Sequence, residues 1–177
     1  SYWGMNEGDY KWAIDCIMAR RIRKVDVGCC SYIVDGAETK RYFLNVVNIG
    51  ISAHVVEIAN REQYVFSKIS STLTALFHLL FYRQNFNMKF TLNNQTVEKK
   101  FMMLCIGNSN GYGMTPSAVP YNGMLDVAAI KRPMFMGMLQ GMYMVWQRKI
   151  MNYKLMEPFR TKEIVIDSVG NAHAGID

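Results

Sequence analysis

The sequence predicts a mainly β fold, an antiparallel β-sandwich with inserted amphipathic helices. Two observations favour this class. Runs rich in β-branched and aromatic residues outnumber helical runs, and most of them are separated by short turns that contain Asn, Asp or Gly. The 177 residues suffice for one buried core, and no charged or Ser/Pro-rich linker divides them. We therefore expect a single domain over residues 1–177.

A short helix is expected first. Apolar residues recur near helical spacing over residues 8–23, Asp9 is a suitable N-cap and basic residues fall in the last turn. The only dense basic run, residues 20–24, is typical of a solvated helix end. The net charge of +6 is compatible with an anionic partner, but its scatter does not indicate nucleic-acid binding.

A hairpin or meander follows the helix. Residues 21–27 and 30–34 are β-like, and Asp35 with Gly36 is a strong tight-turn signal. The aromatic and β-branched run over residues 40–49 then predicts one long strand.

Helical segments come next. Residues 53–61 predict one or two helical turns, and residues 67–82 place Leu and Ile on one face of a longer helix. His54 and His78 fall in these segments. A lone His without a partner carboxylate is more often structural than catalytic, so neither receives a role.

Asn93 and Asn94 predict a hairpin turn between strands over residues 85–92 and 95–106. The second strand ends in an unbroken apolar run, residues 101–106. Such a run is typical of a strand that is buried on both faces.

The polar stretch at residues 107–124 organises the chain, because it connects this buried strand to another at residues 124–130. Its Asn, Gly, Ser and Pro residues support positive φ and local hydrogen bonds. We expect an ordered loop that serves as a binding element. A long hairpin connection without function fits the local chemistry equally well.

The C-terminal third predicts one helix and two strands. Pro133 suits a first helical turn, and residues 133–149 have an apolar face. Residues 162–167 alternate as a strand, and a Gly-Asn turn leads into a last strand at residues 172–177. We place the helices at the edge of the sandwich.

Several site motifs are missing. The sequence has no phosphate-binding glycine loop, no G-x-S-x-G nucleophile and no H-E-x-x-H zinc motif. The cysteines, Cys16, Cys29, Cys30 and Cys105, lack paired zinc-ligand spacing, and three of them are expected to be buried thiols of a protein in the reducing cytoplasm. The longest apolar runs fall short of the roughly 20 residues that span a bilayer.

Four segments, residues 23–28, 42–56, 107–127 and 174–177, resemble successive landmarks of one family. It comprises the bacterial lipid kinases related to diacylglycerol kinase and sphingosine kinase, including the YegS-type proteins. The loop pattern is the most specific: Asn, then Gly-rich residues, Pro-x-Ala, and x-Gly-x-Leu-Asp-Val. Order and spacing match over nearly the whole chain.

The resemblance implies the C-terminal sandwich domain of an enzyme that transfers the ATP γ-phosphoryl group to a lipid hydroxyl. The family's N-terminal domain, with its Gly-Gly-Asp-Gly-Thr nucleotide loop, binds most of the ATP and is absent here. The resemblance also implies Mg²⁺ held by Val119, Asn122 and Met124, although Asn122 replaces the usual Asp. The family's acid/base Glu would follow Asp177. We therefore expect no catalytic residue in this chain and no activity from it alone.

The implied partners are a lipid substrate, ATP, the chain's own N-terminal domain and the inner face of the membrane. Nucleic acid is not expected as a partner, and a homodimer is possible. Methionines of the predicted C-terminal helix are candidates to line a lipid cleft: Met134, Met136, Met138, Met142 and Met144. Core packing is the favoured interpretation of the same residues, because methionine is a flexible filler. The alternative function is a non-catalytic lipid-binding or regulatory module.

Overall fold

A computed structural model describes the chain over residues 9–20, 22–51, 53, 84–110, 114–147 and 149–176. The helical segments expected at 53–61 and 67–82 lie outside the described residues apart from Ala53. His54 and His78 lie outside them as well.

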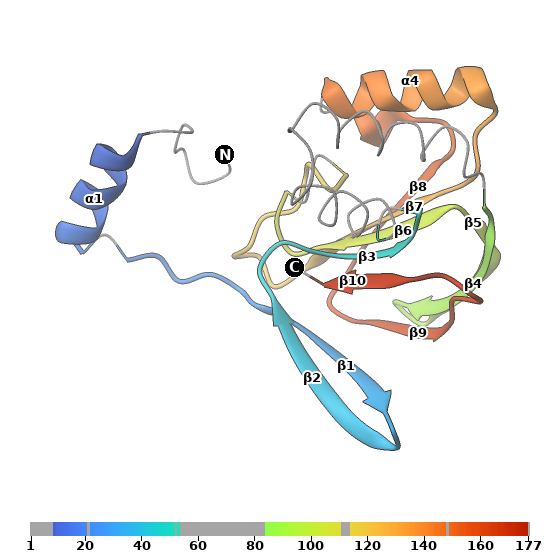
Figure 1. Cartoon of the computed structure of the whole chain (residues 1–177), viewed down its shortest axis with the longest axis horizontal. Coiled ribbons are helices and arrows are strands. Elements are labelled where there is room, and N and C mark those ends of the chain that lie inside the picture. The colour runs from blue at the N-terminus through green and yellow to red at the C-terminus, as the bar shows by residue number, and fades with distance from the viewer. Residues whose placement is uncertain are drawn as a thin grey trace, which may run out of the picture.

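The described residues form ten β-strands, and every pairing between them is antiparallel. The strands are β1 (Gly28–Val34), β2 (Ala37–Phe43), β3 (Val46–Gly50), β4 (Phe86–Leu92), β5 (Gln95–Phe101), β6 (Met103–Gly107), β7 (Leu125–Ile130), β8 (Met156–Thr161), β9 (Ile164–Ser168) and β10 (Ala174–Ile176). One sheet has the order β10-β3-β6-β7-β8, a second has the order β5-β4-β9, and β1 pairs with β2 in a separate hairpin (Figure 1). The predicted mainly β, antiparallel class is confirmed.

The two larger sheets enclose the main core. In β4 alternate residues are buried, so one face of the three-stranded sheet points inward. Phe90 is central to this core: its ring lies 5.9 Å from that of Phe101 and 6.0 Å from that of Phe159, measured between centroids. Because Phe159 belongs to β8, this last contact joins the two sheets. Their packing makes the fold a β-sandwich.

A salt-bridge cluster also joins the sheets. The Glu157 carboxylate in β8 accepts hydrogen bonds from Lys99 Nζ of β5 at 3.1 Å and forms an ion pair with Lys131 Nζ at 2.5 Å. Partial burial by itself raises the pKa of Glu157, but the two ammonium groups outweigh it and hold that pKa below its ordinary value. Glu157 is therefore stabilised in its charged form.

The five-stranded sheet is covered on its other face by α4 (Phe135–Trp146) and the short 3-10 helix η1 (Ile150–Asn152) (Figure 1). All residues of β6 are consequently buried, as its apolar run predicts. The prediction that helices lie at the sandwich edge is wrong for α4. A central strand that is apolar on both faces needs a helical layer on one face as well as a sheet on the other.

Tyr153 fixes α4 to this face. Its hydroxyl donates a hydrogen bond to the Gly137 carbonyl oxygen at 2.8 Å, and burial raises the pKa of Tyr153. A Cβ atom on Gly137 would lie 3.3 Å from the Tyr153 hydroxyl oxygen, and one on Gly141 would lie 3.4 Å from the ring. The two glycines, one helical turn apart, therefore provide the room in which the Tyr153 ring packs.

Two predicted strands are each divided between sheets. The run at 40–49 breaks after Phe43 into β2 and β3, and the run at 95–106 breaks at Met102 into β5 and β6. At the second break the Met102 N–H donates to the Ile130 carbonyl at 2.8 Å, so the interruption is itself hydrogen-bonded. Strands that pass from one sheet to the other commonly do so through such bends.

The N-terminal prediction is partly wrong. The helix α1 (Tyr10–Met18) is shorter than expected, although Asp9 caps it by accepting the Trp12 N–H at 3.3 Å. Residues 22–27 are extended but form no strand, and they lead into β1 of the hairpin (Figure 1).

β8 was not predicted. Pro158 interrupts its strand pattern and cannot donate to a ladder. The strand tolerates this proline because it lies at one edge of the five-stranded sheet.

Candidate functional site

The candidate site is the polar loop between β6 and β7, of which residues 108–110 and 114–124 are described. Its first residues are tied to two other segments. The Asn108 side-chain amide donates to the carbonyl oxygens of Asp26 at 2.8 Å and Leu44 at 3.1 Å, while its backbone N–H donates to the Asn45 carbonyl at 2.8 Å. Asn108 is only 3% exposed, so it acts as a buried polar junction.

The next contacts close the loop upon itself. The Thr115 hydroxyl donates to the Ser109 carbonyl at 3.0 Å, and Thr115 is buried. A Cβ atom at Gly107 would lie 2.1 Å from Thr115 Oγ1, so glycine is required where the strand ends. The prediction of an ordered loop is confirmed over this described part.

The Asn110 side chain has a hydrogen-bond acceptor that none of the described residues satisfies. Its side-chain oxygen Oδ1 is buried and has no hydrogen-bond partner within the described ranges. An unsatisfied buried acceptor is costly, and such atoms often face a ligand or an ordered water molecule. The motif pattern included this residue without assigning it a function.

The three predicted cation ligands lie at a turn over residues 120–123: Asn122 belongs to it, and Val119 and Met124 flank it. The Asn122 oxygen Oδ1 accepts the Met124 N–H at 2.9 Å, and the Val119 carbonyl accepts the Tyr121 N–H at 2.8 Å. Asn122 is exposed, and the other two are partly buried. Amide and carbonyl oxygens suit a hard cation, but all three donors are neutral.

Asp26 brings a negative charge to this turn. Its carboxylate accepts the Gly123 N–H at 2.7 Å, and its own backbone N–H donates to the Pro120 carbonyl at 2.7 Å. The extended segment that carries Asp26 is thereby fastened across the turn. Sequence reasoning gave Asp26 no role, because its partner lies 97 residues further along the chain. In the part of the chain that is described, no three His, Cys, Asp or Glu side chains are grouped as a metal site.

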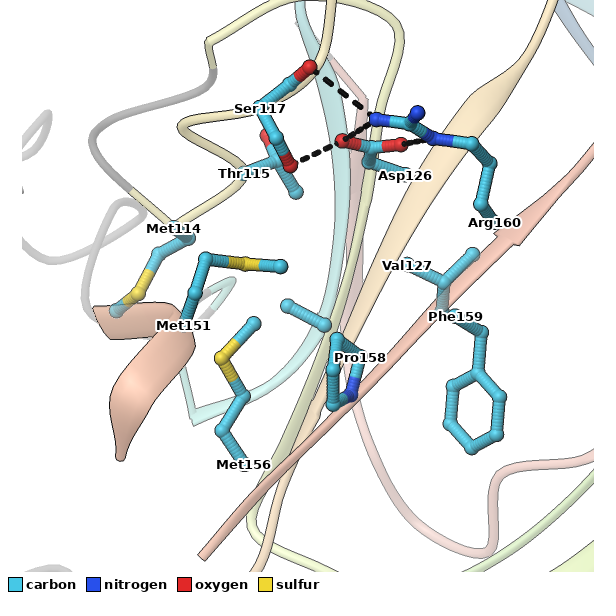
Figure 2. A pocket seen from close by; sticks show the side chains of 11 residues that line it. Met114, Thr115, Ser117, Asp126, Val127, Met151, Met156, Pro158, Phe159 and Arg160 are labelled. Atoms are coloured by element: carbon cyan, nitrogen blue, oxygen red, sulfur yellow. Dashed lines mark hydrogen bonds and ion pairs between the residues drawn. The ribbon is translucent and has the colours of Figure 1, made fainter. Parts of the chain in front are cut away.

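At the other end of the loop, a buried carboxylate joins it to the sheet (Figure 2). Asp126 accepts hydrogen bonds from Arg160 Nε at 2.7 Å, from Arg160 Nη2 at 3.2 Å and from the Ser117 hydroxyl at 2.5 Å. Hydrogen bonding and the charge of Asp126 raise the pKa of Arg160. This cluster was also missed, since Arg160 lies on the unpredicted strand β8.

A pocket of about 290 Å³ lies beside this ion pair, on the helical side of the five-stranded sheet. Figure 2 shows Met114, Met151 and Met156 on one side of it and the polar cluster at one end. The pocket thus combines an apolar wall with a charged end. These methionines differ from the candidates proposed from the sequence.

The candidate methionines of the predicted C-terminal helix differ widely in burial. Met138 is buried and Met144 partly buried, whereas Met134 is 84% and Met136 is 74% exposed. The side chain of Met142 is not among those described. Core packing therefore accounts for Met138 but not for Met134 and Met136. None of the helices in the described ranges has both the length and the apolar character needed to cross a bilayer.

The cysteines are less buried than expected. Cys105 is buried, Cys16 and Cys30 are partly buried, and Cys29 is exposed. Burial, and secondarily the neighbouring Cys29, raises the pKa of the Cys30 thiol. All four are free thiols.

The opposed antiparallel sheets, the helix over one outer face and the polar loop after β6 together define a β-sandwich domain. A family profile described as the YegS C-terminal NAD kinase beta sandwich-like domain matches residues 45–177. The chain belongs to this family, which confirms the resemblance seen in the sequence. No curated protein sequence matches the chain.

Two crystal structures from Bacillus anthracis strain Sterne have a similar fold. One is of a candidate diacylglycerol kinase, with a TM-score of 0.61 and 18% identity over 90% of this chain. The other is of a protein named as a diacylglycerol kinase, with a TM-score of 0.59 and 17% identity over 90% of this chain. The chain covers 52% and 51% of the two structures, so it spans about half their length. At this identity the likeness concerns the fold.

Proposed function

We propose that the chain is the C-terminal, lipid-acceptor-side domain of an ATP-dependent lipid kinase of the diacylglycerol kinase type. The observation that carries this proposal is the likeness to about half of two proteins, one named as a candidate diacylglycerol kinase and one as a diacylglycerol kinase, in a chain of the YegS C-terminal family. The reaction would transfer the γ-phosphoryl group of ATP to a lipid hydroxyl. An N-terminal domain would bind most of the ATP and complete the cleft.

The loop of residues 108–124 is the proposed contribution of this domain to the active site. Phosphoryl transfer depends chiefly on positioning the reactants and neutralising charge. A loop fixed by Asn108 at one end and by Asp126 at the other suits positioning. The unpartnered Asn110 oxygen is available to a donor group of the substrate or of the second domain. The chain itself would supply no acid/base residue.

The turn at Val119, Asn122 and Met124 is the proposed Mg²⁺ site. Two backbone carbonyls and a side-chain amide are hard oxygen donors, which fits this ion. The Asp26 carboxylate, hydrogen-bonded to Gly123, provides the negative charge that Asn122 lacks. Bound Mg²⁺ would supply positive charge next to the loop.

A coupled phosphorylation assay with diacylglycerol and ATP tests the main proposal. It compares this chain with the longer protein that includes the proposed N-terminal domain. We expect turnover by the longer protein and none by residues 1–177. Turnover by residues 1–177 alone would contradict the division of labour, and inactivity of both would contradict the proposed reaction.

A second function is favoured by one observation. Asn122 stands where an ionised ligand is usual, and this change fits a non-catalytic lipid-binding or regulatory module. The sequence upstream of this domain separates the two functions. An intact Gly-Gly-Asp-Gly-Thr loop supports a kinase, and a degenerate one supports the module. For either function we propose a cytoplasmic protein with peripheral contact at the inner face of the membrane.

A further inference from the structure

The outer face of α4 is apolar and exposed. Phe135, Leu139 and Tyr143 are 50%, 43% and 55% exposed and follow each other at intervals of four residues, so they form one stripe along the helix. Met136 lies beside this stripe and is 74% exposed, and Met134, just before the helix, is 84% exposed. We call these five residues the α4 stripe. The helix contains no charged residue.

The packing of α4 does not require this stripe. The helix contacts the domain through its opposite side, where Gly137 and Gly141 face Tyr153 and Met138 is buried. A helix that covers a globular core normally presents charged and polar side chains to water. An apolar outer face on such a helix marks an interaction surface.

The charge around α4 has one sign. The sequence from Val127 to Met156 contains five Lys and Arg residues and no Asp or Glu. Arg132 precedes the helix by three residues and Lys149 follows it by three; both are exposed and form no ion pair within the described residues. Positive groups therefore lie at both ends of the stripe. In Figure 1 the helix forms one outer side of the molecule.

We propose that the α4 stripe and its flanking basic residues form a docking surface for an anionic lipid bilayer. The helix would lie in the plane of the membrane, with the stripe inserted at the boundary between head groups and acyl chains. The basic residues at its ends would contact anionic head groups. This inference deepens the proposed function, because it specifies how the acceptor domain reaches a lipid substrate.

The charge pattern argues against a second copy as the occupant. A two-fold dimer formed through the stripe would place two such surfaces against each other. The basic residues of one copy would then face either the basic residues or the uncharged helix of the other copy, and neither offers an acidic partner. A membrane that carries negative head groups complements both the apolar stripe and its ends.

Co-sedimentation of the chain with vesicles tests the proposal. The vesicles contain phosphatidylcholine alone or phosphatidylcholine and phosphatidylglycerol in equal parts. We expect binding to the mixed vesicles, and at least a tenfold weaker partition for the double variant Met136→Glu/Leu139→Glu. The matched control is Ile33→Glu/Val34→Glu, which introduces the same two carboxylates at side chains that are 77% and 46% exposed in the β1–β2 hairpin. The control should bind like the unchanged chain.

A second pair of variants tests the charge contribution. Arg132→Gln/Lys149→Gln should weaken binding to the mixed vesicles about tenfold and leave binding to phosphatidylcholine unchanged. The control Lys40→Gln/Arg41→Gln removes two charges from the hairpin and should have little effect. Far-ultraviolet circular dichroism confirms the fold of each variant, and Met136→Ser/Leu139→Ser replaces the Glu variant if that one fails to fold.

Several results would overturn the proposal. One is that the chain does not bind the mixed vesicles, and another is that the stripe and control variants lose the same amount of vesicle binding. A third is that light scattering detects a dimer that dissociates in the stripe variant. These measurements need neither ATP nor turnover. If the chain binds vesicles but the longer protein has no kinase activity, only the proposed function is contradicted. If the longer protein is an active kinase but the chain does not bind vesicles, only the docking surface is contradicted.

Discussion

Asp126 and Arg160 form an ion pair whose partners differ sharply in burial, and this difference predicts unequal costs for their removal. The Asp126 side chain is 9% exposed, whereas that of Arg160 is 50% exposed. Loss of the arginine leaves a buried carboxylate without its counter-charge, and loss of the carboxylate charge leaves a guanidinium that water can solvate. Removing Arg160 should therefore destabilise the fold more than neutralising Asp126.

The magnitudes follow from the contacts. Arg160→Met keeps most of the aliphatic stem but deletes both hydrogen bonds to the buried carboxylate, at a cost of about 3 kcal/mol in the free energy of unfolding. Asp126→Asn retains an acceptor for Arg160 Nε and should cost about 1.5 kcal/mol. The double variant should cost about 2 kcal/mol, less than the sum of the single changes, because its buried position no longer carries a charge.

Urea denaturation followed by circular dichroism measures these free energies, and the larger loss should lower Tm by about 6–12 °C. Lys40→Met is the matched control. It removes an ion pair of 3.7 Å with Glu38 whose side chains are 55% and 62% exposed, and it should cost less than about 0.5 kcal/mol. Equal costs for Asp126→Asn and Arg160→Met, or additive costs in the double variant, would refute the reasoning.

Three further predictions follow. Glu157→Gln should lower the free energy of unfolding by about 1 kcal/mol at pH 7. Urea titrations at several pH values should show this difference from the unchanged chain shrinking below the ordinary carboxyl pKa of 4.5 and vanishing as pH falls through the lowered pKa; a difference that is constant with pH contradicts this. Tyr153→Phe should lower the free energy of unfolding by about 1 kcal/mol and speed amide hydrogen exchange in α4, because the hydrogen bond to the Gly137 carbonyl is lost. Unchanged exchange would show that this bond does not hold the helix. Asn122→Asp should tighten Mn²⁺ binding about tenfold and Asp26→Asn weaken it, measured by electron paramagnetic resonance; the reverse order removes the turn as a cation site.

Local chemistry predicted the hairpins well. Asp35 with Gly36, and Asn93 with Asn94, adopt the positive φ values that tight two-residue turns require, from 48° to 80°. The apolar run of β6 likewise predicted burial on both faces. These features depend on residues that are neighbours in sequence, so a single sequence is sufficient to recognise them.

Sheet membership could not be predicted in the same way. The run at 95–106 looks like one strand, since every residue around Met102 is compatible with β structure. It is divided because Phe101 faces the three-stranded sheet's core while Met103 belongs to the other sheet. The choice depends on partners that are distant in sequence, above all Ile130, which accepts the Met102 N–H.

The candidate site shows the same division. The turn at Val119, Asn122 and Met124 was located from its own motif. Asp26 and Arg160 were not, because they meet their partners across 97 and 34 residues. A spacing motif reveals a loop, but not the carboxylate or guanidinium that another element places beside it.

These distant partners determine how the loop can act. Asp26 fixes the turn at Gly123 from the extended segment, and Arg160 fixes Asp126 from the edge strand β8. Asn108 connects the start of the loop to the same extended segment through the Asp26 carbonyl. Groups that are held before the substrate arrives need little reorganisation during phosphoryl transfer. In the proposed kinase, these tertiary contacts would therefore contribute to the rate by positioning the loop. Asp26, Asn108 and Arg160 need not touch the transferred group themselves.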